Sequence, residues 1–344
     1  MQTISRKTNN QGGFLNSRNN HILNSLILFQ SPPSDWHTNN SKTNLMLQLK
    51  TAGYIAIDNL RKRDAFPPTW QTQEELEELA NRYHAMFLEE RFEVSRALGA
   101  GFFVQELIDR SIRTNEREYM DDPALPPEKR LEMIRALDHM NNMMMFYPQY
   151  IRVIEPSVME IFEREKRPVK LLELASGAGG LAFALAEQAK TGKLPIEIRG
   201  SDVVSEYVEF GNLTAKEQRL PVDFQQINAF SMDPAENGRY DIILLSQSLH
   251  HFSPGQLARI IVQSRKSGAS LFLGLDGHRG LDLLAGVPMI AMFERIAALA
   301  LDGYTSARKF YSETELDLIA EIATGANRHT LELSWPLSVL KIQL

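Results

Sequence analysis

The chain has 344 residues, 43% hydrophobic and 23% charged, so most of it is expected to fold around packed cores. Its net charge is −6 and no basic run is dense enough to neutralise a row of phosphates, which argues against nucleic acid as a substrate. The absence of cysteine excludes disulfides and thiolate zinc sites. The longest early apolar stretch, around Leu26–Phe29, is far shorter than the ~20 residues that span a bilayer. We expect a cytoplasmic protein without a membrane span.

The N-terminal part divides into a tail and a helical region. Residues 1–44 are rich in Asn, Ser and Thr and hold no acid before Asp35, which predicts a flexible tail, with a targeting segment as the alternative. Residues 45–168 show helical spacing, and Thr72 with Glu75 can form a capping box. We predict a helical cap domain with helices over 74–96, 102–112, 128–145 and 156–165.

The pattern changes after residue 168, where short apolar runs alternate with helical segments. Strands are predicted over 169–174, 196–201, 223–227, 240–246 and 270–275, and a long apolar helix over 281–301. A hairpin over 330–335 and 338–344 closes the chain. This alternation predicts an α/β fold for residues 169–344, with a doubly wound, mostly parallel, Rossmann-like sheet of seven strands and a C-terminal antiparallel hairpin. Ligands bind at the carboxyl ends of such strands.

A glycine turn follows the first of these strands. The apolar run that contains Glu173 leads into Gly177-x-Gly179-x-x-Ala182, where glycines permit a sharp bend and close approach of a ligand. The spacing fits the dinucleotide fingerprint almost as well as the pattern of S-adenosylmethionine (SAM) enzymes. Asp202, about twenty residues further on, is placed to accept hydrogen bonds from ribose hydroxyls of either cofactor. The turn alone leaves both cofactors open.

Further markers favour one of the two cofactors. They are the turn Glu173–Gly179, Asp202, Asn228-Ala229-Phe230 and Ser248-Leu249-His250-His251-Phe252. With these and the closing hairpin, the sequence from Val169 onward resembles the class I SAM-dependent methyltransferases, in particular the ubiquinone-biosynthesis-like small-molecule subgroup. The resemblance implies SAM as cofactor, held by Glu173, Ala175, Ser176, Gly177, Gly179, Asp202, Val203, Asn228, Ala229, Phe230 and Ser246. Two positions depart from the family pattern, because Ala175 replaces the commonest first glycine and Asn228 stands where Asp is usual.

The candidates for catalysis and substrate binding lie after the fourth and fifth strands. His250 and His251 are the candidate base, since an imidazole with a pKa of about 6.5 can accept a proton from a phenol or enol. As neighbours after a strand they are expected to point in different directions, and support of the following helix is the alternative role. The candidate substrate contacts are Asp276, Arg279, Arg308 and Tyr311. A salt bridge from Arg279 to Asp276 or Asp282, and core packing of the others, are the alternatives, and no metal ligands are expected.

Together these features predict an enzyme of secondary metabolism that moves a methyl group from SAM to a small, largely apolar metabolite. The acceptor is expected to be phenolic, a quinone or polyketide-like, and its reacting atom an oxygen or a carbon. Two alternatives stay open, a nicotinamide-dependent oxidoreductase and a non-catalytic binding protein with the same fold. The sequence also leaves open whether the chain forms a homodimer.

Overall fold

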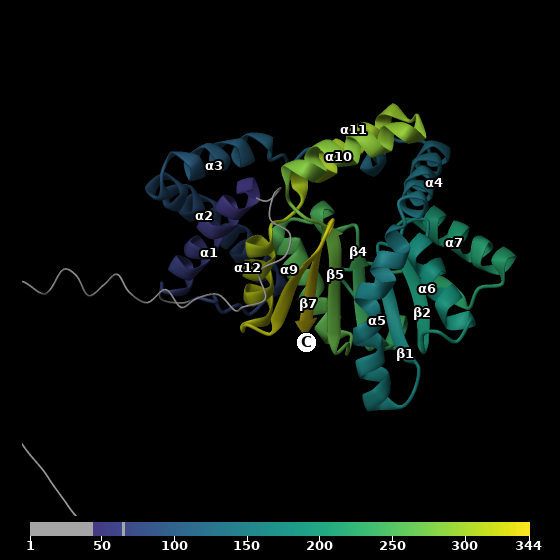
Figure 1. Cartoon of the computed structure of the whole chain (residues 1–344). Coiled ribbons are helices and arrows are strands. Elements are labelled where there is room, and N and C mark those ends of the chain that lie inside the picture. The colour runs from purple at the N-terminus through teal and green to yellow at the C-terminus, as the bar shows by residue number, and fades with distance from the viewer. Residues whose placement is uncertain (1–43, 64–65) are drawn as a thin grey trace, which may run out of the picture. The chain divides into compact units, whose positions relative to one another are not determined.

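The structure is a computed structural model that describes residues 44–63 and 66–344, with side chains from residue 49 onward (Figure 1). The tail predicted over residues 1–44 lies outside the described residues, apart from Asn44, where the first helix begins. Within the described part of the chain, no helix combines the length and the apolar character needed to cross a bilayer.

Seven strands form one mixed sheet with the order β3-β2-β1-β4-β5-β7-β6. Strands β1 to β5 run parallel, whereas β7 is antiparallel to both β5 and β6. The strand bounds are β1 Val169–Leu174, β2 Ile196–Asp202, β3 Val222–Gln226, β4 Ile242–Ser246, β5 Leu271–Gly277, β6 His329–Ser334 and β7 Leu337–Gln343. The predicted fold class is confirmed, and each predicted strand end falls within two residues of the observed one.

The helices surround this sheet and include the predicted N-terminal set. Their bounds are α1 Asn44–Arg61, α2 Gln73–Leu98, α3 Ala100–Ile112, α4 Pro127–Met143, α5 Phe146–Glu165, α6 Gly180–Lys190, α7 Ser205–Gln218, α8 Pro234–Asn237, α9 Pro254–Lys266, α10 Leu281–Ala291, α11 Ala297–Lys309 and α12 Glu313–Thr324. Short 3₁₀ turns are η1 Tyr119–Asp121, η2 Leu249–His251 and η3 Met292–Glu294.

Two helix predictions were wrong. Helix α5 begins ten residues before the predicted start and contains Pro156. The hydrogen bond that this proline cannot donate would reach Arg152, on the exposed side, while residues such as Ile154 and Val158 stay buried on the other side. The single helix predicted over 281–301 is instead α10 and α11, because η3 and the left-handed Arg295 (φ 57°) interrupt it.

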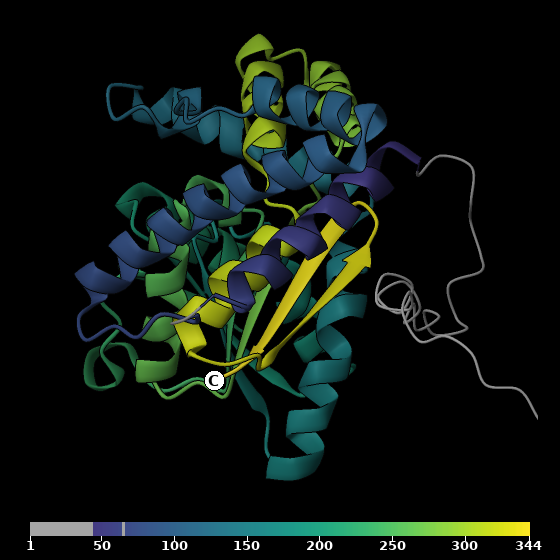
Figure 2. The ribbon, with the colours of Figure 1, turned by 90° about the vertical axis from the view of Figure 1, so that its left-hand side faces the viewer.

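Alternating strand residues face two different hydrophobic cores. On β4, Ile242 and Leu244 pack into a core with α5, α6 and α7, whereas Ile243 and Leu245 pack into one with α1, α2, α9 and α12. Figure 2 shows α1 and α2 on the opposite side of the sheet from α5. Because the N-terminal helices share these cores, residues 44–344 form one compact unit. The division at residue 168 into a cap domain and a methyltransferase domain stays a prediction.

The carboxyl ends of the parallel strands lie at the end of the sheet where α4, α10 and α11 meet (Figure 1). Helix α4 comes from the N-terminal part of the chain, and the other two come from the segment after β5. They share a small core built on Met140, Ala291 and Leu299. Residues from distant parts of the sequence therefore surround the edge where ligands of such sheets bind.

Candidate active site

The glycine turn joins β1 to α6 in a left-handed conformation. Ala175, Gly177 and Gly179 have φ angles of 50°, 54° and 85°. A Cβ on Gly179 would lie 2.5 Å from the ring of Phe224, so only glycine fits there. The Ser176 amide donates to the carbonyl of Ser201 at 2.8 Å, which fixes the turn against β2.

Asp202 ends β2 and holds the same turn through its side chain. The Gly177 amide donates to Oδ2 at 3.0 Å, and the Val204 amide donates to Oδ1 at 2.9 Å. Burial raises the pKa of Asp202, partly offset by these amides. Because a carboxylate offers about four lone pairs, it can still accept from ribose hydroxyls. The Val203 side chain next to it is exposed.

Glu173 lies beneath the turn with one carboxylate oxygen unused. Its side chain is almost fully buried, and the Ser246 hydroxyl donates to Oε1 at 2.7 Å. Oε2 is buried and has no hydrogen-bond partner among the described residues. Burial raises the pKa of Glu173 to about 7, against the opposing effects of the Ser246 hydroxyl and the Ala182 backbone amide. An orphaned buried acceptor beside a glycine turn fits a cationic group such as the ammonium of an amino-acid moiety.

The segment after β3 forms an ordinary Asn turn. Asn228 is exposed, and its Oδ1 accepts from the Phe230 amide at 2.9 Å. Ala229 and Phe230 are half-buried against the core, and the Phe230 ring meets Phe252 edge-on with centroids 5.8 Å apart. Contact of these residues with an adenine ring stays a prediction.

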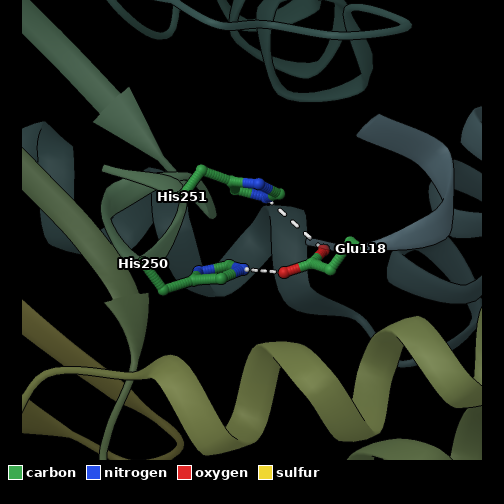
Figure 3. Close-up of side chains that lie close together, drawn as sticks. All are labelled: Glu118, His250 and His251. Atoms are coloured by element: carbon green, nitrogen blue, oxygen red, sulfur yellow. Dashed lines mark ion pairs between the residues drawn. The ribbon is translucent and has the colours of Figure 1, made fainter. Parts of the chain in front are cut away.

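His250 and His251 both face Glu118 (Figure 3). The Nε2 atom of His250 lies 3.5 Å from Glu118 Oε1, and that of His251 lies 3.7 Å from Oε2. The expectation that the rings point apart was wrong, because η2 is helical and strand alternation does not apply to it. The rings lie 4.3 Å apart, tilted by 36°.

Acidic partners surround the two imidazoles. His250 Nδ1 lies 2.8 Å from Asp276 Oδ2 at the end of β5, and His251 Nδ1 lies 2.9 Å from Asp121 Oδ2. Lys309 pairs with Glu118 at 3.1 Å. Burial alone would lower the pKa of His250, but Asp276 and Glu118 raise it to about 9. The two histidines and Lys309 hold the pKa of Glu118 well below its usual range despite its burial.

The other predicted substrate contacts are engaged within the chain. Arg279 donates to Asp109 Oδ1 at 2.6 Å, and not to Asp276 or Asp282 as the sequence suggested. The Arg308 Nε donates to the carbonyl of Ile112 at 2.9 Å. The buried Tyr311 hydroxyl donates to the carbonyl of Phe252 at 2.7 Å. Their contact with a substrate stays a prediction, whereas Asp276 contacts His250 directly.

Sequence reasoning missed Glu118, Asp121 and Lys309. The first two lie about 130 residues before the histidines and outside any recognisable motif. Lys309 ends α11, where a lysine is ordinary for a helix C-terminus. Only the packing of η1 and α11 over η2 brings them to the site.

Comparison of the sequence with known proteins gives one family match and one partial relative. Residues 171–267 match the family model described as Methyltransferase domain. A stretch of 96 residues, 28% of the chain, is 31% identical to the non-reducing polyketide synthase esdpA of Penicillium shearii, and it covers only 4% of that synthase.

Two solved structures are similar at low identity. One is the plantazolicin methyltransferase BpumL in complex with SAH, with 13% identity, a TM-score of 0.48, and coverage of 76% of this chain and 99% of that one. The other is the magnesium protoporphyrin IX methyltransferase of Synechocystis PCC 6803 with bound SAH, with 13% identity, a TM-score of 0.41, and coverage of 68% and 92%.

The family match and the observed sheet agree. The matched residues carry the glycine turn, Asp202 and both histidines. The sheet has seven strands, and β7 is antiparallel as the predicted C-terminal hairpin requires. Residues 171–267 therefore match a methyltransferase domain, and they lie within a seven-stranded, mostly parallel sheet of the predicted fold class.

Proposed function

We propose that this chain is a SAM-dependent methyltransferase. It acts on an oxygen or carbon of a small, largely apolar acceptor that is phenolic, a quinone or polyketide-like, with His250 as the base. The observation that carries the proposal is the buried imidazole of His250. Asp276 holds its Nδ1, and its Nε2 makes no hydrogen bond among the described residues. It follows β4 directly, at the edge of the sheet where the cofactor residues lie.

Residues on β1, β2 and β4 would hold the cofactor. The free oxygen of Glu173 suits the ammonium of the methionine part, and Asp202 suits the ribose hydroxyls. Asn228 and Phe230 remain the proposed contacts of the adenine. When bound, SAM supplies a methyl group on a sulfonium, whose leaving group is a neutral thioether.

The protein's own chemical step would be removal of a proton. The neutral form of His250 is the minor form at pH 7, because its acidic partners raise its pKa to about 9. This form accepts the acidic proton of the acceptor on Nε2, and the electron pair that stays on the acceptor forms the bond to the methyl carbon. Asp276 stabilises the imidazolium that results, because its carboxylate contacts Nδ1 at 2.8 Å. Glu118 faces the same Nε2 at 3.5 Å, so the acceptor must displace or share this carboxylate.

Exposed apolar side chains near this end of the sheet support an apolar acceptor. They lie on α10, on η3 and at the end of α4, and they are Met143, Met144, Met145, Met289, Met292 and Phe293. Methionine side chains adapt to irregular apolar ligands. The partial relative is a polyketide synthase by name, which favours a polyketide-like acceptor among the three classes. We propose that the enzyme works in the cytoplasm on such metabolites and not on nucleic acid.

The test is turnover with a defined acceptor panel. Purified full-length chain is incubated with SAM and with phenols, quinones and hydroxy-polyketides, and mass spectrometry follows SAH and methylated product together. We expect equal amounts of the two for at least one class, and NMR of the product then assigns the oxygen or carbon. SAM binding without turnover on any class would favour a non-catalytic role. Sedimentation of the same sample distinguishes a monomer from a homodimer.

A further inference from the structure

The side chains of Glu118, His250 and His251 converge on one point (Figure 3). One ligand atom from each lies within 4.8 Å of the others. The two imidazole–carboxylate distances are 3.5 and 3.7 Å. In a tetrahedral zinc site with bonds of about 2.0–2.1 Å, neighbouring ligand atoms lie about 3.4 Å apart. The two distances run to different oxygens of Glu118, so binding of one shared ion through a single oxygen would require the three groups to move together from their separation of up to 4.8 Å.

Each histidine has an acidic partner on the nitrogen that points away from this convergence. Asp276 contacts Nδ1 of His250 and Asp121 contacts Nδ1 of His251, at 2.8 and 2.9 Å. Metal-binding histidines commonly donate their second ring nitrogen to a carboxylate, which fixes the tautomer and leaves the other lone pair for the ion. Independently of this pattern, Nε2 of His250 is buried and has no hydrogen-bond partner in the described part of the chain.

The charge around the cluster favours a cation. Glu118, Asp121 and Asp276 contribute three carboxylates, and Lys309 is the cation paired with Glu118, at 3.1 Å. These three carboxylates and the lysine carry a net charge of −2, which a divalent ion would balance. Lys309 does not preclude this, because a carboxylate retains other lone pairs for a metal.

We propose that His250 Nε2, His251 Nε2 and one carboxylate oxygen of Glu118 bind a divalent transition-metal ion such as Zn²⁺. Two imidazoles and one carboxylate form a donor set that zinc accepts with a further position open to solvent or ligand. The ion takes the lone pair of His250 that proton removal needs. Binding does not depend on the proposed base, but a bound ion and a basic His250 exclude each other.

The experiment measures ion binding directly on the full-length chain after removal of metals with a chelator. Calorimetry with ZnCl₂ and visible absorption with CoCl₂ are expected to show one site per chain. Glu118→Gln and His251→Ala should weaken it at least ~10²-fold, since each removes a ligand, and the exposed Asp121→Asn should weaken it about 10–100-fold. The matched control is His139→Ala, which removes an exposed histidine that pairs with Glu294 and should change nothing. Circular dichroism checks that each variant is folded.

The outcomes separate this proposal from the proposed function. Absence of the site, or binding that is equal in the wild type and in folded Glu118→Gln and His251→Ala, would overturn the ion site. Loss of binding in these variants together with intact binding in His139→Ala supports it. Turnover assays with and without Zn²⁺ then test the base: an ion-saturated enzyme that is fully active would leave the ion site supported by the binding data and remove the base role of His250.

Discussion

The glycine turn and the histidine cluster differ in how far along the chain their partners lie. Asp202 and Gly177, which contact each other at the turn, are 25 residues apart, and the register between β1 and β2 fixes them. Asp121 and His251, which contact each other in the cluster, are 130 residues apart. The register of the sheet therefore preorganises the proposed cofactor site around the glycine turn, which we call the cofactor half. The histidine cluster, which we call the reacting half, is completed only when the N-terminal segment packs over it.

The largest effect is expected from His250→Ala. If His250 is the base, turnover should fall by about 10²–10⁴-fold, while SAM affinity changes little because the cofactor half is intact. His251→Ala should cost less, since His251 contacts the half-exposed Asp121 and not the buried Asp276. Single-turnover rates with saturating SAM measure both. Equal rates for wild type and His250→Ala would leave the histidine only a structural role.

Gly177→Val should weaken SAM binding at the cofactor half and leave the histidine cluster intact. A Cβ at Gly177 would lie 3.0 Å from Ile134 of α4, in a backbone with φ 54° that branched side chains avoid. The free turn is expected to relax from this strained conformation, so its restoration on SAM binding costs about 1–3 kcal/mol. This cost corresponds to a loss of SAM affinity of about 5–150-fold. Calorimetric titration with SAM measures it, with circular dichroism to confirm folding. Unchanged affinity would contradict the assignment of this turn to the cofactor.

The same contrast explains what could be predicted from the sequence. The strands, the terminal hairpin and the position of Asp202 at the end of a strand follow from periodicity and local spacing. The hydrogen bond from the Gly177 amide to Asp202 was not predicted. The acidic surroundings of His250 could not be predicted, since Glu118 belongs to a short segment between helices with no motif of its own. The break at Arg295 was also missed, because an arginine gives no sequence signal of a left-handed turn.

Glu173→Gln tests the charge in the cofactor half. Burial raises the pKa of Glu173 to about 7. If the ionised carboxylate binds the cofactor ammonium, SAM affinity should fall up to about tenfold for each pH unit below 7, and Glu173→Gln should remove this dependence. Affinity titrations from pH 6 to 8 measure it.

The pH dependence of folding stability, compared between the wild type and Glu173→Gln, tests the raised pKa of Glu173 independently. The folded state holds a proton on Glu173 more tightly than the unfolded state does, so this group's contribution to stability falls as pH rises from the unfolded value of 4.5 to about 7. The Gln variant should lack that fall. A parallel pH dependence in both proteins would contradict the raised pKa.

The smallest effect is expected from Ala175→Gly, which restores the family's commonest residue. Ala175 has φ 50°, a conformation that costs an L-residue about 1–2 kcal/mol, whereas glycine adopts it freely but loses about 0.5–1 kcal/mol through its more flexible unfolded chain. The free energy of unfolding should therefore rise by about 0–1.5 kcal/mol, measured by denaturant titration, with SAM affinity unchanged. The matched change Gly177→Ala in the same turn should act in the opposite direction, because it adds the left-handed cost. A clear destabilisation by Ala175→Gly would mean that packing of the Ala175 methyl against the core stabilises the fold by more than the left-handed conformation costs. Burial of this methyl would then explain why the turn tolerates alanine where the family usually has glycine.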